Sequence, residues 1–397
     1  MTKAALTIAL LTPAWPGTST PNGIVTSVVH MAAGLREIGH VPVILGRPDG
    51  PPPEDIAFVP LAEPHWTLTD KIRARLTGGA KINSKLRIAA IVAAVRTAHA
   101  RYGLDVLIME ESLGWPYHVI PAVPVPVVIY LHGPWALMTE ARGQGESGAD
   151  RARITLEARA FARAAGIIAP SEAAAAVTDD IAHIKQAIIP NACPVAESGP
   201  SEARRTDHIL YVGRVERLKG VDTLLGAFEL LGQTHPETRL TFVGPDRGLL
   251  LEDGRTVGMD EAIATLAPGM RARIDYLGPR PPGDIAALRQ THGIALMASR
   301  FETLSYTMLE ALAAGQAMVS TRVGGPAEVL EDGVTGRLVP PGDAGAMAAA
   351  LAELIGDPSE QARLAEAGRA MLGTRFAPAR IADETVGFLR TVLAERA

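Results

Sequence analysis

Short apolar runs alternate along this chain with longer segments in which apolar residues recur at helical spacing. The short runs are typical of strands buried in a parallel sheet, and the longer segments are typical of the helices that connect such strands. The pattern therefore predicts an α/β fold. A first series contains a helix at Val25–Ile38 and strands at Ala5–Leu11, Val41–Leu45, Asp105–Met109, Val127–Leu131 and Gly166–Ala169.

A second series of the same kind follows a polar segment at Ala196–Asp207, which contains Gly199 and Pro200 and is interpreted as a linker. We therefore expect two doubly wound, Rossmann-like domains, at residues 1–198 and 199–375. A last helix is expected from about Pro378 to Glu395. The expected elements of the second series are strands at His208–Val212, Arg239–Val243, Arg273–Tyr276, Gly293–Met297 and Ala317–Ser320, with helices at Val221–Leu231 and Asp343–Ile355.

Length and composition agree with two soluble domains. The 397 residues exceed the roughly 100–200 of an ordinary domain, and 47% hydrophobic with 20% charged residues is typical of a globular protein. A formal charge of -5 argues against a dedicated nucleic-acid binder. The single cysteine, Cys193, cannot form an intrachain disulfide, so a cytoplasmic location is expected. The apolar run after Lys3 is interpreted as a buried strand rather than a secretory signal.

One segment, Asp70–Arg87, carries a local excess of positive charge on an acidic protein. Such a segment is more often a solvated face. The alternative is peripheral contact with the anionic inner face of a membrane that carries a lipid-linked acceptor. The cations are Lys71, Arg73, Arg75, Lys81, Lys85 and Arg87.

Doubly wound sheets bind their ligands at the carboxyl ends of the strands, where this chain concentrates polar and aromatic residues. In the first series these loops contain three of the four tryptophans, whose rings suit the apolar faces of sugars. The alternative is that each indole caps a core and finds a partner for its N–H group. The loop residues are Trp15, Asn22, Gly23, Glu110, Glu111, Trp115, His132, Gly133 and Trp135.

In the second series, Arg214 and Lys219 lie five residues apart between a strand and a helix. The planar fork of arginine and the point charge of lysine suit a diphosphate, and both would stabilise negative charge on a leaving nucleotide. The alternative is a solvated basic turn.

The strongest local signal is the segment Ser299–Glu310, which follows a strand and enters an Ala-rich helix. With a helix beginning near Ser305, Glu302 lies in the loop before it and Glu310 on its second turn. The helix N-terminus offers backbone N–H groups to a phosphate, and the carboxylates accept bonds from sugar hydroxyls. The alternatives are that Glu302 complements the helix dipole and that Glu310 is an ordinary exposed residue.

Taken together, these motifs resemble the family 4 retaining glycosyltransferases of the GT-B fold, in which two Rossmann-like domains face each other across a cleft. The resemblance covers nearly the whole chain, and the glutamate pair with seven residues between is its most specific mark. The matching segments are Asn22–Val25, Leu131–Gly133, Ala169–Glu172, Ile189–Asn191, Gly213–Arg214, Lys219–Gly220, Val243–Gly244, Tyr276–Gly278, Glu302–Glu310 and Val323–Glu328.

The resemblance implies a division of roles. Backbone N–H of Gly23 and the amides of Leu304 and Ser305 would bind the diphosphate, which Arg214 and Lys219 would neutralise. It also implies that the C-terminal helix, about residues 376–397, rejoins the first domain. The remaining implied positions are Glu310 at the ribose, Glu302 and Thr303 at the transferred sugar, His132 beside the reaction centre, Gly278 to Arg280 at the base, and Trp15, Trp115 and Trp135 on the acceptor side.

One departure concerns the donor sugar, because Thr303-Leu304-Ser305 replaces the glycine-rich sequence that the family often has there. Their side chains would enter the space of the sugar. UDP-sugars are the first expectation and GDP-sugars the second, with a sugar or glycoconjugate hydroxyl as acceptor. No cofactor or catalytic metal is expected, because the chain lacks an Asp-x-Asp motif. The hypothesis for the mechanism is front-face substitution, with Glu302 holding sugar hydroxyls rather than attacking.

Other functions stay open. A GT-B epimerase or phosphorylase would share the fold and the phosphate site, and a non-catalytic sugar-binding protein would share the cleft. A nicotinamide dehydrogenase would need a Gly-x-Gly-x-x-Gly turn directly after a strand. That spacing occurs at Gly143, Gly145 and Gly148, but no predicted strand leads into it, so it is interpreted as a loop.

Overall fold

The computed structural model describes residues 5–16, 22–52, 54–63, 66–67, 79–142, 145–181, 183–195, 204–251 and 253–395. The chain divides into two compact units. Unit 1 comprises Met1–Thr139, Glu146–Ala192 and Pro378–Ala397, and unit 2 comprises Glu140–Gly145 and Cys193–Ala377. The sequence had placed the division at residues 198 and 199, with the return near residue 376.

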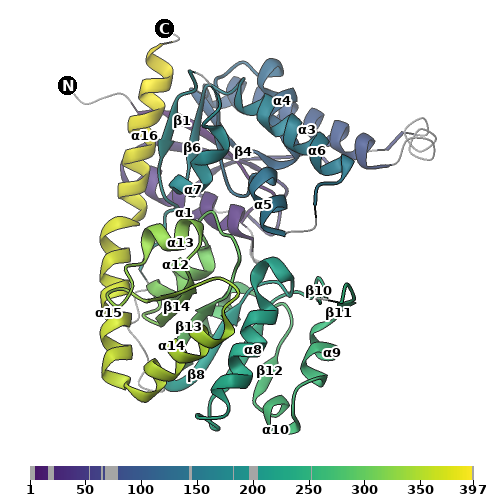
Figure 1. Ribbon diagram of the computed structural model, residues 1–397. Coiled ribbons are helices and arrows are strands. Elements are labelled where there is room, and N and C mark those ends of the chain that lie inside the picture. Colours follow the sequence, from purple (N-terminus) through teal and green to yellow (C-terminus); the bar gives the residue numbers. More distant parts are fainter. Residues whose placement is uncertain are drawn as a thin grey trace. The chain divides into compact units, whose positions relative to one another are not determined.

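Unit 1 is built on a seven-stranded sheet in the order β3-β2-β1-β4-β5-β6-β7, with every pair of strands parallel (Figure 1). The order runs outward from β1 in both directions, as in a doubly wound sheet. Sequence reasoning missed the two edge strands, β3 and β7. The bounds are β1 Thr7–Leu11, β2 Val41–Gly46, β3 Ala57–Pro60, β4 Val106–Glu110, β5 Val127–Tyr130, β6 Gly166–Ala169 and β7 Gln186–Ile188.

Helices cover both faces of this sheet, because side chains alternate along each strand. From β1, Ile8 and Leu10 pack against α1 and α16, whereas Ala9 and Leu11 pack against α3. A Cβ on Gly34 of α1 would lie 2.1 Å from the backbone oxygen of Pro378, so α16 packs directly on the α1 backbone. The helices are α1 Gly23–Glu37, α3 Gly79–Tyr102, α4 Pro116–Val119, α5 Trp135–Arg142, α6 Gly148–Phe161, α7 Glu172–Ala175 and α16 Pro378–Ala394, with short turns at Ser112–Gly114, Ile120–Ala122 and Ala176–Thr178.

Unit 2 has a six-stranded sheet in the order β12-β9-β8-β13-β14-β15, again parallel throughout. The predicted pair of doubly wound α/β sheets is therefore confirmed. A small antiparallel hairpin, β10-β11, was not predicted. The strands are β8 Arg205–Val212, β9 Arg239–Val243, β10 Leu249–Leu250, β11 Thr256–Val257, β12 Ile274–Tyr276, β13 His292–Met297, β14 Ala317–Thr321 and β15 Arg337–Val339.

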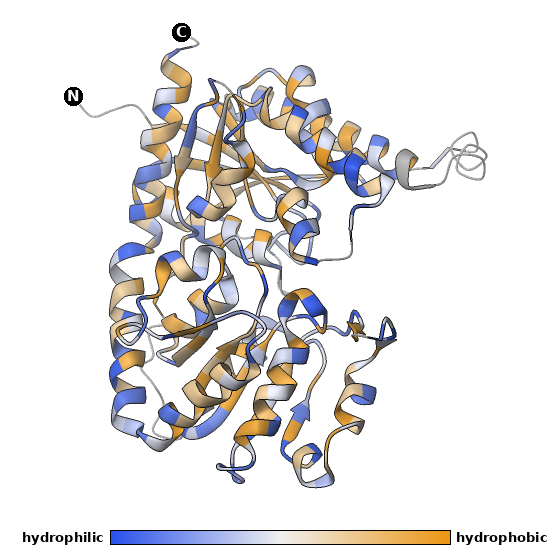
Figure 2. Cartoon of the chain, viewed as in Figure 1, coloured by the Kyte–Doolittle hydropathy of each residue, from blue (hydrophilic) through white to orange (hydrophobic). Residues whose placement is uncertain are grey.

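The helices of unit 2 also cover both faces. From β13, Ile294 and Leu296 pack toward α8 and α14, and Ala295 and Met297 pack toward α12 and α15. Figure 2 shows the strands largely coloured as hydrophobic and the helices in both colours, as expected for amphipathic helices on a buried sheet. The helices are η4 Arg217–Lys219, α8 Val221–Leu231, α9 Met259–Ala264, α10 Pro268–Arg271, α11 Pro282–Thr291, α12 Tyr306–Ala313, α13 Gly324–Val329, α14 Ala344–Gly356 and α15 Pro358–Arg375.

Two sequence features fall partly outside the described residues. Of the basic segment, only the side chains of Lys85 and Arg87, on α3, are described, and of the glycine-rich spacing, Gly143 is outside. Within the described part of the chain, every helix is too short or too polar to span a bilayer.

Candidate functional site

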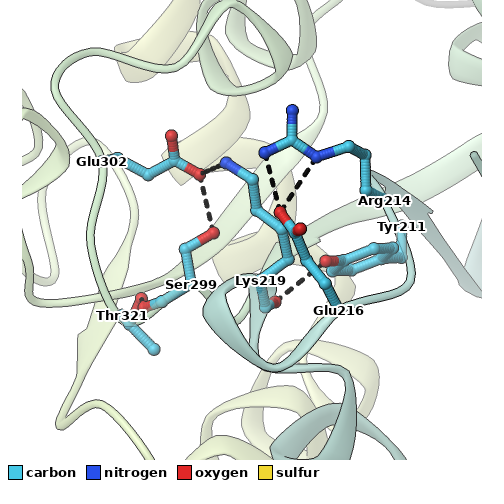
Figure 3. Close-up of polar contacts among 7 residues, drawn as sticks. All are labelled: Tyr211, Arg214, Glu216, Lys219, Ser299, Glu302 and Thr321. Atoms are coloured by element: carbon cyan, nitrogen blue, oxygen red, sulfur yellow. Dashed lines mark hydrogen bonds and ion pairs between the residues drawn. The ribbon is translucent and has the colours of Figure 1, made fainter. Parts of the chain in front are cut away.

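The centre of the site in unit 2 is an ion pair between Lys219 and Glu302, whose Nζ and Oε1 atoms lie 2.5 Å apart (Figure 3). The same carboxylate oxygen accepts a 2.7 Å bond from the hydroxyl of Ser299. Both charged side chains are largely buried, at 18% and 12% exposed. Among the described residues, these bonds all end on Oε1, which leaves Oε2 of Glu302 available to a ligand hydroxyl.

Two close backbone approaches hold the loops that carry this pair. Gly220, which follows Lys219, has a φ of +68°, and a Cβ there would lie 1.8 Å from the carbonyl oxygen of Ala298. Gly324, at the start of α13, would place a Cβ 2.0 Å from the oxygen of Glu302. Only glycine fits such contacts at positive φ. The two glycines therefore fix the loops after β8 and β13, and with them the pair.

A second ion pair, missed by sequence reasoning, ties the same loops together. Arg300 donates to both carboxylate oxygens of Asp222 on α8, at 2.8 and 2.6 Å, and also to the backbone oxygen of Arg217. The bidentate geometry suits the planar guanidinium. Arg300 therefore links the loop after β13 to the start of α8.

Arg214 lies at the edge of this group rather than inside it. Its side chain is 43% exposed and donates from Nε and one terminal nitrogen to Oε1 of Glu216, at 2.9 and 2.7 Å (Figure 3). Glu216 holds the guanidinium at the loop surface, where it can bind an anion from solvent.

Glu310 is not an isolated exposed residue. It lies on α12, 38% exposed, and its Oε2 accepts a 3.1 Å bond from Arg289, which is only 4% exposed. Arg289 also donates to the side chain of Gln316 at 3.2 Å. Burial lowers the pKa of Arg289, and the charge of Glu310 opposes that shift. Arg289 thus tethers one carboxylate oxygen of Glu310, a role that the sequence did not reveal.

The segment between the two glutamates differs from expectation. Thr303 is 7% and Leu304 4% exposed, and Leu304 packs in a core cluster with Tyr306 and Met308. The expectation that the Leu304 side chain enters the space of a bound sugar is therefore wrong, because the side chain lies in the core. Ser305 is the N-cap of α12, which begins at Tyr306 as expected.

The expected base-binding segment lies at the carboxyl end of β12. Gly278 has a φ of +66°, its oxygen accepts a bond from Gly244, and Arg280 is exposed. The structure thus places these residues after an edge strand of the same sheet, which β9 separates from β8.

In unit 1, Asn22 is the N-cap of α1, and its side chain accepts bonds from the N–H groups of Ile24 and Val25. The helix therefore begins at Gly23, two residues before its predicted start. Gly23 is exposed at that terminus, where backbone N–H groups favour anions.

A buried carboxylate holds the backbone at His132. Both oxygens of Glu111, which is 2% exposed, accept backbone bonds, from His132 at 3.0 Å and from Gly133 at 2.6 Å. Burial raises the pKa of Glu111 to about 7 despite these bonds. Burial also lowers the pKa of His132 to about 4, so its ring is neutral at pH 7, stacked 4.8 Å from Tyr130.

The three tryptophans differ in what they can offer a ligand. Trp15 is 2% exposed and packs in the core beside α1, so its expected acceptor-side contact is not available. Trp115 is partly buried against the α3 cluster. The Trp135 indole donates to Asp150 at 2.8 Å, and the guanidinium of Arg153 lies 3.8 Å from its ring centre. One face of Trp135 is therefore already covered.

No group of three metal-binding side chains occurs among the residues that the structure describes. The expectation of metal-independent chemistry stays a prediction.

Comparison with known families matches both halves of the chain. The family model described as glycosyltransferase family 4 matches residues 21–197, and the model described as glycosyl transferases group 1 matches residues 200–371. Relatives include a D-inositol 3-phosphate glycosyltransferase of Corynebacterium urealyticum, 34% identical over 39% of this chain, and a glycogen synthase of Mycobacterium tuberculosis, 31% identical over 45%. The matches span only 36% and 40% of those two relatives.

Solved structures share the fold over nearly the whole chain. Sucrose-phosphate synthase from Thermosynechococcus elongatus has a TM-score of 0.76 at 20% identity, covering 98% of this chain and 100% of that one. Anabaena HepE in complex with UDP-glucose has a TM-score of 0.68 at 20% identity, covering 97% and 100%. The lipopolysaccharide glycosyltransferase WaaG has a TM-score of 0.66 at 16% identity, covering 96% and 100%. The expected GT-B fold is confirmed.

Proposed function

The chain belongs to the family 4 glycosyltransferases, and from that premise we propose that it transfers a sugar from a nucleotide donor to a hydroxyl of a sugar or glycoconjugate, with retention of configuration. UDP-sugars are the first candidates for the donor, and GDP-sugars the second. The complexes of HepE with UDP and with UDP-glucose support that order.

The proposed donor site lies in unit 2. Arg214 and Lys219 would neutralise the diphosphate, the start of α12 would add backbone donors, and Glu310 would accept bonds from ribose hydroxyls. Gly278 and Arg280 would flank the base. Because Arg289 occupies Oε2 of Glu310, the ribose would bind at Oε1.

The observation that carries the mechanism is the bonding of Glu302. Its Oε1 is paired with Lys219 and hydrogen-bonded by Ser299, which lowers its electron density and fixes its orientation. Such a carboxylate is a poor nucleophile and a good hydroxyl acceptor. This supports Glu302 as the residue that orients the donor sugar.

The proposed reaction is a front-face substitution. The bond from the anomeric carbon to the phosphate oxygen breaks, the acceptor oxygen bonds to the same face of that carbon, and the acceptor proton moves to the departing phosphate. Arg214 and Lys219 stabilise the charge of that phosphate. His132, a neutral hydrogen-bonding group at pH 7, would lie beside the reaction centre.

The test is product analysis with UDP-glucose, UDP-N-acetylglucosamine and GDP-mannose as donors. Glucose, D-inositol 3-phosphate and glycogen serve as an acceptor panel, chosen from the names of the relatives. Mass spectrometry detects the conjugate, and proton NMR reports its anomeric configuration. An α-linked product from an α-linked donor is expected. An inverted product contradicts the mechanism, and a donor that is only epimerised, or cleaved by inorganic phosphate, contradicts the proposed reaction.

A further inference from the structure

Glu110 is a buried carboxyl that the proposed reaction does not use. It is the last residue of β4, 7% exposed, beside Glu111, whose own oxygens both bond the backbone at His132 and Gly133. In the part of the chain that the structure describes, Oε2 of Glu110 is buried and has no hydrogen-bond partner. A buried polar atom without a partner destabilises the fold, so its retention calls for an explanation.

Glu110 belongs to the lining of a small cavity in unit 1. The cavity measures about 20 Å³, enough for one water-sized group. Its walls are mostly apolar, with side chains from β1, α1 and β4, and its polar lining includes Glu110, Ser27, Tyr130 and His132. Among the lining residues that the structure describes, Ile24 and His132 are partly exposed and the others are buried, which places the opening of the cavity between the start of α1 and the His132 ring.

The size of the cavity limits what can enter it. A sugar ring does not fit, whereas a single hydroxyl does. The apolar walls offer a hydroxyl few other partners, so its hydrogen bonds would be made with the polar lining.

The protonation of Glu110 suits the same partner. Burial raises its pKa to about 7, with the neighbouring charge of Glu111 adding to the shift and the Glu110 backbone N–H opposing it. Near neutral pH the group is therefore present in both forms. It can accept a hydrogen bond from a hydroxyl or donate one to it.

We propose that Glu110 is an acceptor-specificity residue, which receives one hydroxyl of the acceptor in the cavity beside His132. This inference rests on the proposed function, because it assumes that the acceptor binds to unit 1. Glu110 would recognise an acceptor hydroxyl that does not itself react. The acceptor is accordingly a polyol, with at least one hydroxyl besides the nucleophile.

The experiment compares Glu110→Met with the wild type, using the acceptor of the panel that the wild type glycosylates and each of its singly deoxygenated forms. The methionine side chain has a similar length and no carboxyl. We expect kcat/KM for the acceptor to fall about 10- to 100-fold, mainly through KM. Nucleotide affinity, measured by calorimetry with UDP, should be unchanged.

One deoxygenated acceptor should identify the hydroxyl. Its kcat/KM with the wild type should be low, and Glu110→Met should lower that value no further. In that combination both the acceptor hydroxyl and the carboxyl that would bind it are absent. Glu110→Gln, which keeps a donor and an acceptor, should recover part of the lost activity. Leu107→Met, an apolar exchange on the same strand at a buried position outside the cavity lining, is the matched control and should behave like the wild type.

Two results would overturn the proposal, and they differ. In the first, the wild type transfers sugar to an acceptor, and Glu110→Met has the same KM for that acceptor and the same decrease in kcat/KM with every deoxygenated form. Glu110 then does not bind the acceptor. In the second, the wild type neither transfers sugar nor cleaves the donor with any donor and acceptor of the panel. The proposed function then fails, and the role of Glu110 fails with it. A folded state of Glu110→Met, shown by its thermal transition, separates either result from misfolding.

Discussion

Replacing Glu110 with glutamine should make unit 1 more stable at alkaline pH and leave it little changed near pH 4.5. The pKa of Glu110 is about 7 in the folded protein, against an ordinary value of 4.5. The folded state therefore holds a proton that the unfolded state has lost between these values. The stabilisation is fully present below pH 4.5 and is lost as the pH rises through 7.

The magnitude follows from the two pKa values. Their difference of about 2.5, at about 1.4 kcal/mol for each pH unit, corresponds to roughly 3 kcal/mol of unfolding free energy. Glutamine cannot ionise, so the variant should gain about this amount on the wild type between pH 4.5 and pH 8. Glu111 titrates in the same range but is present in both proteins, so most of its contribution cancels in the difference.

The positions of the tryptophans make the assay selective. All four, Trp15, Trp66, Trp115 and Trp135, belong to unit 1, so their fluorescence during urea denaturation reports this unit. Unfolding free energies of the two proteins are measured from pH 4.5 to pH 8, with Leu107→Met as a control whose effect should not depend on pH. A difference between Glu110→Gln and the wild type that stays constant over this range would refute the reasoning.

Four further outcomes are expected. Glu302→Gln should lower kcat about 10²- to 10³-fold with a smaller effect on donor KM, because the orientation of the sugar is lost; a mainly KM effect in steady-state kinetics would contradict this role. Arg289→Gln should weaken UDP binding roughly tenfold by calorimetry, and no further when Glu310→Gln is also present. His132→Ala should reduce turnover strongly, and near-normal turnover would remove its catalytic role. EDTA should leave activity intact, and a large loss would contradict metal-independent transfer.

The sequence predicted the elements that are long, apolar and buried on both sides. The strands that it missed are short and lie at sheet edges, such as Gln186–Ile188, where partial exposure removes the apolar signal. The resemblance to the family also implied that Lys219 and Glu302 would share a donor site. The structure shows that the strands that precede them, β8 and β13, are neighbours.

What the sequence could not give were partners that depend on side-chain direction. Arg289 and Glu310 are 21 residues apart on different helices, and no periodicity joins them. Trp15 follows a strand, like the other loop tryptophans, and only its packing shows that it belongs to the core. Glu110 and Glu111 were both among the predicted loop residues, but their separate environments depend on which way each carboxyl turns.

The packing of α16 in unit 1 has a consequence for the order in which this protein folds during synthesis. Within unit 1, β1 is made before unit 2, whereas the apolar side of α16 is made after it; this side includes Ile381, Val386 and Leu389. All of unit 2 from Cys193 to Ala377 emerges from the ribosome in between. Unit 2 can therefore complete its core during translation, whereas the apolar surface of α1 in unit 1 stays uncovered until α16 has been made. A nascent chain stalled before residue 378 would expose that surface to chaperones and proteases.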